Sequence, residues 1–342
     1  MPKEEREKKL ERLVGGGVTE EEYVLGLSLR PKALAEFIGQ KDSLTSLSIA
    51  IEAAKKRKEA LEHILLSGPP GLGKTSLAHC IAKELSARII ATSGPAIERA
   101  GDLIGILTNL DKGDILFIDE IHRISKVVEE FLYPAMENFQ IDFVIDKGPF
   151  AKTVKFNLKP FTLIGATTRE GMLSEPLRSR FGIFLRFDFY TQDEICEVIR
   201  RSAKILGIEI EPAAVVEIAC RGRGTPRLAN RLLRRVRDYS QVKGDGKITA
   251  INVKKALSFL KIDEKGLDEF DRRYLKVLIE FYQGGPSGIE AIAANMGESA
   301  DTLMDVVEPY LMKLGFIKRS LRGRVALKPA YEHLGLKYKE PV

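Results

Sequence analysis

The sequence is poor in cysteine and has no long apolar run. Its three cysteines, Cys80, Cys196 and Cys220, are scattered and never form a CxxC pair. This argues against a disulfide framework or a zinc site and favours a reducing, cytoplasmic environment. No apolar stretch approaches the roughly 20 residues that a membrane-spanning helix needs, so no membrane contact is expected. The first residues, MPKEEREKKLERL, lack the apolar segment of a signal peptide, and residues 1–22 are expected to form a charged tail.

Internal repeats and low-complexity tracts are also absent. The 342 residues, 44% of them hydrophobic, are enough for two or three domains, each with its own core. The net charge of +6 is a mild excess. It permits a polyanionic partner but does not identify one, so the places where positive charges cluster matter more.

Residues 23–188 predict an α/β domain. Apolar, strand-like runs alternate there with helix-like stretches, which is typical of a parallel sheet with helices on both faces. These runs lie at residues 63–67, 115–118, 161–165 and 181–187. Helical periodicity continues through residues 189–261, which predicts a small helical domain. Residues 262–337 contain further helix-like segments and then a short strand pattern with a glycine turn.

The motif GPPGLGKTS follows the first strand and precedes an amphipathic helix. This is the GxxxxGK[ST] phosphate loop in the strand–loop–helix context that it requires. Its glycines let backbone N–H groups turn toward phosphate oxygens, and the helix N-terminus adds positive potential. Lys74 is expected to reach the β- and γ-phosphates of ATP, and the Thr75 hydroxyl to bind Mg²⁺. The predicted nucleotide contacts in this loop are Gly71, Gly73, Lys74, Thr75 and Ser76.

The segment GDILFIDEIH carries two carboxylates to the end of a second apolar strand. Asp119 is predicted to hold the Mg²⁺ shell, and Glu120 to polarise a water for attack on the γ-phosphate. The prediction that the protein hydrolyses ATP, and does not only bind it, rests mainly on Glu120. A third strand, FTLIGATTRE, ends in threonines that could hydrogen-bond the γ-phosphate and the water. Thr168 is preferred to Thr167, and the alternative is that both simply fit a strand end.

Two arginines interrupt the segment EPLRSRFGIF just before the last strand. An arginine there needs an anion, and the residues leave two choices, a salt bridge within the chain or a phosphate. The order of phosphate loop, DE strand, polar strand tip, arginine loop and helical segment resembles the AAA+ ATPases. That resemblance implies that Arg180 reaches the γ-phosphate held by a neighbouring subunit, where such a residue is worth roughly 10³–10⁵ in rate. Arg178 would support it or form a surface ion pair.

The helical block contains GRGTPRLANRLLRRVRD. Thr225-Pro226 is typical of a helix start, with proline in the first turn. In the AAA+ arrangement Arg227 would face back toward the nucleotide from this helical lid.

The resemblance extends to the bacterial RuvB family, the ATP-driven motors that branch-migrate Holliday junctions. It rests on LSLRPKALAEFIGQ, LLSGPPGLGKTSLAH, ILFIDEIHR, LYPAMENF, FTLIGATTREGML, LRSRFGI, RGTPRLANRLLRRVRD and GFIKRSLRGRVAL. It implies a homo-hexameric ring on duplex DNA, acting in recombination, DNA repair and the SOS response, with RuvC resolvase as a further candidate partner. Leu29 and Arg30 would line the adenine pocket and Tyr190 would close it; the alternative is that Tyr190 only packs between domains. Asn138 and Leu321 stand where the family often has aspartate and proline.

Residues 141–157 show strand alternation around a Lys-Gly-Pro turn and predict an inserted β-hairpin that the ATP site does not need. By the RuvB resemblance this hairpin meets RuvA, the junction-binding partner. The alternative is a hairpin that packs on its own domain.

The third block predicts a winged helix that binds DNA. GIEAIAANMGESADTLMDVVEPYLMKLGFI is a helix–turn–helix pattern, and GFIKRSLRGRVAL is a strand–turn–strand wing. Its cations crowd a short hairpin and no opposing carboxylates are expected, so they fit phosphate contacts that carry no sequence preference. The predicted DNA residues are Arg319, Arg324 and Arg322. A wing that is merely soluble is the alternative.

Three functions compete for this architecture. The first is a RuvB-type DNA motor, which is preferred. The second is an AAA+ switch such as an initiator or clamp loader, which does not explain the hairpin and the lid signature together. The third is a protein unfoldase, which would need an aromatic pore loop. The segment GPAIERAGDLIGILTNLDKGD, between the phosphate loop and the DE strand, has no aromatic residue.

Overall fold

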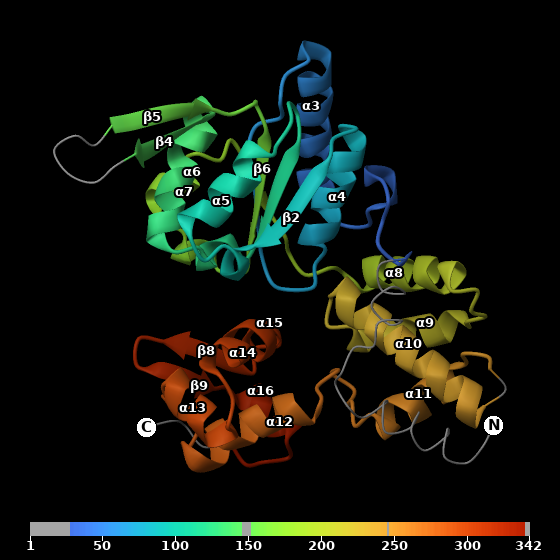
Figure 1. The fold of residues 1–342 in the computed structure, drawn as a ribbon. Coiled ribbons are helices and arrows are strands. Elements are labelled where there is room, and N and C mark those ends of the chain that lie inside the picture. The colour runs from blue at the N-terminus through green and yellow to red at the C-terminus, as the bar shows by residue number, and fades with distance from the viewer. Residues whose placement is uncertain (1–27, 146–151, 245, 339–342) are drawn as a thin grey trace, which may run out of the picture. The chain divides into compact units, whose positions relative to one another are not determined.

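The computed structural model describes residues 28–145, 152–244 and 246–338. The chain divides into two compact units (Figure 1). One unit is Arg30–Asp188, and the other contains the described residues from Phe189 onward together with Ser28 and Leu29. The charged tail predicted for residues 1–22 lies outside the described residues. In the part of the chain that is described, no helix combines the length and apolar character needed to cross a bilayer.

The first unit is built on a five-stranded parallel sheet of order β2-β3-β6-β1-β7. Strands β1, β3 and β6 are buried along almost their whole length because helices cover both faces, which confirms the predicted α/β class. The strands are β1 (Ile64–Ser67), β2 (Ile89–Ser93), β3 (Ile115–Asp119), β6 (Thr162–Thr167) and β7 (Ile183–Arg186).

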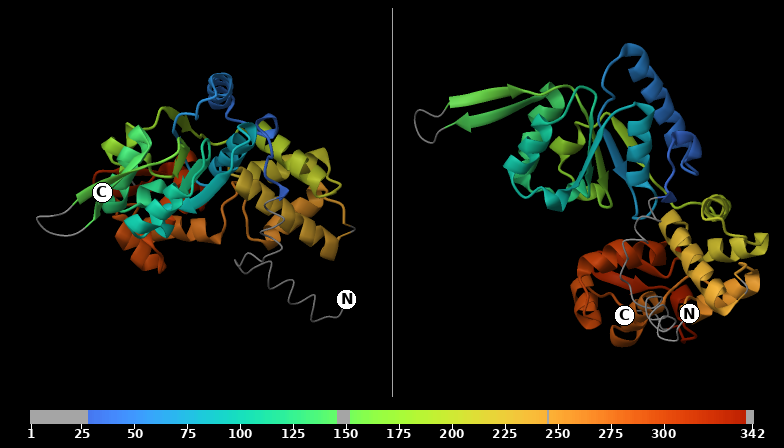
Figure 2. Two further views of the ribbon diagram at one scale, coloured as in Figure 1. Left: turned by 45° about the horizontal axis from the view of Figure 1, so that its top comes forward. Right: turned by 45° about the vertical axis from the view of Figure 1, so that its right-hand side comes forward.

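Helices α3 and α4 lie on one side of the sheet, and α5, α6 and α7 lie on the other (Figures 1 and 2). Alternate strand residues such as Leu65, Leu116 and Leu163 join the core under α5 and α6. The helices are α3 (Lys41–Arg57), α4 (Lys74–Glu84), α5 (Ala100–Thr108), α6 (Lys126–Asn138) and α7 (Glu175–Arg178), and the short helical turns are η1 (Leu34–Glu36), η2 (Gly94–Ala96), η3 (Ile121–Arg123) and η4 (Glu170–Met172).

Strands β4 (Gln140–Ile145) and β5 (Lys152–Asn157) pair antiparallel in a separate two-stranded ribbon. Figure 2 shows this ribbon extending away from the five-stranded sheet. Helix α6 leads directly into β4, with Phe139 between them in a left-handed conformation. The tip of the predicted hairpin, residues 146–151, lies outside the described residues.

The second unit begins with four helices: α8 (Gln192–Ile205), α9 (Pro212–Arg221), α10 (Pro226–Lys243) and α11 (Ala250–Phe259). Thr191 starts α8 with a capping box, because its hydroxyl accepts from the Glu194 N–H while the Glu194 side chain accepts from the Thr191 N–H. As predicted, Thr225 and Pro226 begin α10. These helices form the lid domain.

The rest of the second unit is a winged helix with its own core, which includes the buried Tyr274 and Tyr331. Ser299 caps the second helix of the helix–turn–helix by accepting from the Thr302 N–H. The wing strands pair antiparallel. The elements are α12 (Glu269–Lys276), η5 (Val277–Phe281), α13 (Ile289–Met296), α14 (Ala300–Thr302), η6 (Leu303–Val307), α15 (Glu308–Lys313), β8 (Ile317–Ser320), β9 (Gly323–Ala326) and α16 (Lys328–His333).

A buried histidine ties the sheet to α6. His63, just before β1, accepts a hydrogen bond from the Leu163 N–H at 2.9 Å through Nδ1. Its Nε2 lies 3.1 Å from the Met136 carbonyl oxygen and donates to it. Both ring nitrogens are therefore paired in the neutral form. Burial lowers the pKa of His63 below its usual 6.5, because the charged imidazolium would lose its hydration there.

We expect His63 to make stability depend on pH. With a folded-state pKa below the unfolded value, its contribution is complete above about pH 6.5 and is lost as the pH falls. His63→Phe leaves a buried N–H and a buried carbonyl unpaired, which should cost about 1–3 kcal/mol at pH 8. The difference in unfolding free energy between the two proteins, measured by urea denaturation, should shrink at pH 5.5. An equal difference at both pH values would contradict this assignment.

Candidate nucleotide site

The predicted phosphate loop lies between β1 and α4, at the carboxyl edge of the sheet. Gly68, Gly71 and Gly73 all have positive φ, at 136°, 80° and 104°, so the loop needs the conformational freedom of glycine. A Cβ on Gly68 would lie 2.4 Å from the Phe187 carbonyl oxygen. Helix α4 begins at Lys74 immediately after the loop. Its free N–H groups and the loop amides form a concave donor surface of the kind that binds phosphate.

Lys74 is buried against its own loop. Its Nζ donates to the carbonyl oxygens of Gly68 at 2.6 Å and Pro69 at 2.9 Å. Burial lowers the pKa of the ammonium, and the nearby carboxylates of Glu120 and Asp119 counter that effect. The charge is thus held at the centre of the loop, where the β- and γ-phosphates would lie.

Asp119 and Thr75 are the residues that fit Mg²⁺. The Thr75 side chain hydrogen-bonds the Asp119 carboxylate, and burial followed by repulsion from Glu120 raises the pKa of Asp119. Among the described residues, no group of three or more His, Cys, Asp or Glu side chains could hold a metal ion. One carboxylate and one hydroxyl suit Mg²⁺, which usually keeps several waters and takes phosphate oxygens as further ligands.

Glu120 follows β3 in a left-handed conformation, with φ of 48°. Its Oε2 accepts from the Thr168 hydroxyl at 3.1 Å and from the Thr168 N–H at 3.3 Å. The Thr167 hydroxyl instead contacts His122 Nδ1 at 2.9 Å and accepts from the Arg169 N–H. The geometry therefore places Thr168, and not Thr167, beside the carboxylate expected to activate water.

Two neighbours of Glu120 were not anticipated from the sequence. His122, with a side chain only 4% exposed, places Nδ1 3.2 Å from Glu120 Oε2. Gly94, at the end of β2, lies so close that a Cβ there would be 2.4 Å from the Glu120 carbonyl oxygen. The sequence did offer an indication of His122, because this residue follows Glu120 by only two positions. Nothing in the local sequence marked Gly94, because its neighbour comes from another strand.

Arg180 lies just after α7 and makes its contacts within its own chain. Its Nη2 is 2.8 Å from Glu137 Oε1, and its guanidinium carbon lies 4.4 Å from the centre of the Tyr133 ring. Arg178 is exposed. The ion pair within the chain, one of the two alternatives for Arg180, is thus present. A role of Arg180 toward a neighbouring subunit stays a prediction.

Three family models match consecutive parts of the chain between residues 29 and 335. Residues 29–187 match the RuvB P-loop domain, described as that of a Holliday junction DNA helicase. Residues 190–263 match the RuvB AAA lid domain, and residues 264–335 match the RuvB C-terminal winged-helix domain. The chain belongs to the RuvB family.

Similar proteins carry the same family name. The Holliday junction branch migration complex subunit RuvB of Dehalococcoides mccartyi (strain CBDB1) is 56% identical over 96% of this chain and 94% of its own length. The corresponding Kosmotoga olearia subunit is 55% identical over 92% of each chain. The solved Thermotoga maritima RuvB Holliday junction branch migration motor superposes with a TM-score of 0.85 at 53% identity, covering 91% of this chain and 100% of that one. Membership of this family supports the motor hypothesis over the switch and unfoldase hypotheses.

The other residues that the RuvB resemblance assigns to the nucleotide are divided between the two units: Leu29, Tyr190 and Arg227 belong to the second unit and Arg30 to the first. Tyr190 and Leu29 are buried, and burial raises the pKa of the Tyr190 hydroxyl. The Tyr190 N–H donates to the Gly224 carbonyl at 2.9 Å, which connects the start of the lid to the loop before the exposed Arg227. Arg30 belongs to the first unit, where it lowers the pKa of His79 on α4, after the larger effect of burial.

A buried arginine connects the lid to the winged helix. Arg223 donates to the Gly266 carbonyl at 2.8 Å and forms an ion pair with Asp271. Its guanidinium also lies 5.2 Å from the Tyr310 ring centre. Burial raises the pKa of Asp271 to about 6, against the opposing effect of Arg223. The loop that precedes Arg227 is thereby held to the predicted DNA-binding domain.

The wing corrects one expectation. Its arginines do have an opposing carboxylate, which comes from α15 and not from the wing itself. Glu308, fully buried, accepts from Arg324 Nε at 2.8 Å and from Arg319 Nε at 2.8 Å, and the Tyr274 hydroxyl also donates to it. Arg324 is largely covered, with 14% of its side chain exposed, whereas Arg319 keeps 44%. Glu308 begins α15, outside the wing segment, so the wing sequence alone does not indicate this carboxylate.

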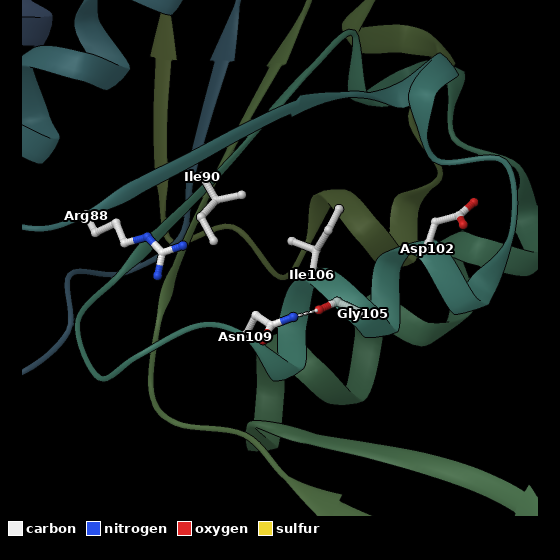
Figure 3. A pocket seen from close by; sticks show the side chains of 6 residues that line it. All are labelled: Arg88, Ile90, Asp102, Gly105, Ile106 and Asn109. Atoms are coloured by element: carbon white, nitrogen blue, oxygen red, sulfur yellow. Dashed lines mark hydrogen bonds between the residues drawn. The ribbon is translucent and has the colours of Figure 1, made fainter.

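A shallow groove lies between the edge strand β2 and α5 (Figure 3). It is lined by Arg88, Ile90, Asp102, Gly105, Ile106 and Asn109. Ile90 lies at the amino-terminal end of β2 and Arg88 directly precedes the strand, whereas the phosphate loop lies at the carboxyl edge. The groove is therefore separate from the nucleotide site.

For the wing we expect the exposed cations Lys318 and Arg322 to account for salt-dependent binding. Each phosphate contact contributes about 0.9 to the slope of log K against log salt. Lys318→Ala with Arg322→Ala should flatten the slope for duplex DNA by about 2. Arg273→Ala with Lys276→Ala removes the same charge from exposed positions on α12 and serves as the matched control. An equal change in both variants would show a general charge effect.

Proposed function

We propose that this protein is the ATP-driven motor subunit that branch-migrates Holliday junctions in recombination and DNA repair, including the SOS response. The observation that carries the proposal is the arrangement at the carboxyl edge of the sheet. A phosphate loop with a buried lysine, a Thr75–Asp119 pair and a Glu120 carboxylate held by Thr168 occur together in a chain with a winged helix. The relatives that share all three domains are named as branch migration subunits.

Hydrolysis is an in-line displacement at the γ-phosphorus of ATP. Glu120 orients a water and accepts its proton as the new P–O bond forms and the bond to the β-phosphate oxygen breaks, releasing ADP and inorganic phosphate. Lys74 and the loop amides, including those of Gly71, Gly73 and Ser76, stabilise the negative charge. Bound Mg²⁺ would neutralise phosphate charge, and Thr75 and Asp119 would hold it.

Residues outside this cluster complete the proposed cycle. Leu29, Arg30 and Tyr190 would hold the adenine, and Arg227 would relate the lid to the γ-phosphate. Arg180 would meet the ATP of the neighbouring subunit, which requires a ring, taken as a homo-hexamer. A planar, permanently charged guanidinium suits the charge that develops during phosphoryl transfer.

The proposed partners follow from the two remaining surfaces. The exposed wing cations Lys318, Arg319 and Arg322 would bind duplex DNA through phosphates, and Arg324 would anchor the wing. The β4–β5 ribbon would dock the junction-binding protein RuvA, and RuvC resolvase would act on the same junction. We place this work in the cytoplasm, as a DNA translocase of the helicase type.

Branch migration of a synthetic four-way junction tests the function directly. With ATP, Mg²⁺ and RuvA, the wild-type protein should convert the junction to duplex products. Glu120→Gln should still bind nucleotide but should lose roughly 10²–10⁴-fold in turnover and fail to move the junction. ATP hydrolysis by the wild type on duplex DNA without any junction movement would favour a non-translocating switch.

Mixed rings test whether Arg180 acts on a neighbour. Glu120→Gln chains and Arg180→Ala chains should each be nearly inactive, the second by roughly 10³–10⁵-fold. In a random equal mixture about a quarter of the interfaces pair an intact Glu120 with an intact Arg180, so ATPase activity should partly recover. The matched control replaces the Glu120→Gln chain with a chain that carries both substitutions, and it should show no recovery. Absence of recovery in the test mixture would place the action of Arg180 within its own chain.

A further inference from the structure

Arg180 is held by one face of α6. Tyr133 lies beneath its guanidinium, with 4.4 Å between the guanidinium carbon and the ring centre, and Glu137 lies 2.8 Å from Nη2. The two residues are four positions apart on the helix and so point the same way. Nη1 donates to the Pro176 carbonyl oxygen. Only 20% of the Arg180 side chain remains exposed, so the direction in which the guanidinium points is set by these contacts.

The Tyr133 ring is itself fixed by a buried carboxylate. The Tyr133 hydroxyl donates to Glu129 Oε1 at 2.6 Å, and Glu129 is 8% exposed. Ser174 also donates to this oxygen and caps α7 by accepting from the Leu177 N–H at 3.2 Å. Burial and the hydrogen bond to Glu129 raise the pKa of Tyr133, which keeps the phenol protonated as a donor. One carboxylate therefore fixes both the ring under Arg180 and the start of the helix that leads to it.

The two contacts of Arg180 differ in what they do to its charge. Glu137 neutralises the guanidinium, but this carboxylate is 51% exposed, and such ion pairs are weak because water competes for both partners. A multiply charged phosphate can therefore replace it. The Tyr133 ring attracts the cation through its face and leaves its charge without a neutralising partner.

We propose that Tyr133 is a positioning residue for Arg180, whose stacked ring aims the guanidinium at the phosphate of the next subunit, and that Glu137 is an exchangeable counter-ion. The proposal rests on the proposed role of Arg180 in that subunit's ATP site. It adds a requirement that the ring of Tyr133 be present for the arginine to be effective, while the carboxylate of Glu137 is dispensable.

The test compares three variants of the full chain, assembled on duplex DNA, over a range of ATP concentrations that gives both kcat and KM. Tyr133→Leu removes the ring and should lower the ATPase kcat by about 10-fold or more, because misplacing a catalytic group is costly. Its KM for ATP should change by less than about twofold, because its own phosphate loop is intact. Tyr133→Phe keeps the ring but frees it from Glu129, and should cost about two- to threefold. Glu137→Gln should stay within about threefold of wild type.

Two further readouts separate positioning from a general structural effect. Adding Tyr133→Leu to Arg180→Ala should lower kcat no further, because the ring acts only through the arginine. Tyr133→Leu chains mixed with Glu120→Gln chains should regain activity, since the latter donate correctly held arginines. If Tyr133→Leu does not fold, as judged by thermal unfolding, Tyr133→Met, which also lacks the ring, carries the same combination with Arg180→Ala.

The outcomes distinguish this proposal from the function on which it rests. Normal kcat for Tyr133→Leu beside a strongly impaired Arg180→Ala would overturn the role of Tyr133 and leave the role of Arg180 standing. A further loss when the two substitutions are combined would also overturn it, because the ring would then act elsewhere. Normal activity of Arg180→Ala would overturn both.

Discussion

The parallel pairing of β3 with β6 is the constraint on which the catalytic arrangement depends. In this register Ile118 is opposite Gly165, so both strands end at the same edge and deliver Glu120 and Thr168 to within hydrogen-bonding distance. The pairing of β1 with β6 brings the phosphate loop to that edge as well. Parallel strands require long crossover connections, and these connections are the helices that bury both faces of the sheet. The same constraint that builds the core therefore gathers the reactive groups.

Helix α6 contacts or leads into three features that are separate in the sequence: Arg180, the β4–β5 ribbon and His63. Its middle and end carry Tyr133 and Glu137 against Arg180. Its C-terminus passes into the β4–β5 ribbon through Phe139, whose ring packs edge-on against Phe161 at 5.8 Å and near His63 at 6.3 Å. His63 in turn accepts from β6 and donates to α6. The ribbon thus starts from a packed aromatic junction, and the arginine is held by the same rigid helix.

Several charged side chains in this protein are buried and paired with a partner, and are not simply exposed to solvent. Glu308, Glu129 and Asp271 are buried carboxylates, and each is matched by arginine or by hydroxyl donors. A buried carboxylate without such partners would be strongly destabilising. In the wing this pairing divides the cations into two groups: those that anchor the hairpin, led by Arg324, and those that face solvent, such as Arg322.

The sequence by itself determined the fold class, the phosphate loop, the DE strand end and the order of the three domains. These features are local: a strand, a glycine loop and a helix must follow one another to make the site, and each leaves its periodicity or motif in consecutive residues. Only the tertiary structure decided that Thr168 rather than Thr167 faces Glu120, that Glu308 pairs with the wing arginines, and that Arg180 stacks on Tyr133. Each of those contacts joins residues from different elements. Periodicity shows which face a side chain occupies, but the partner on the facing element depends on register and packing, which no local pattern specifies.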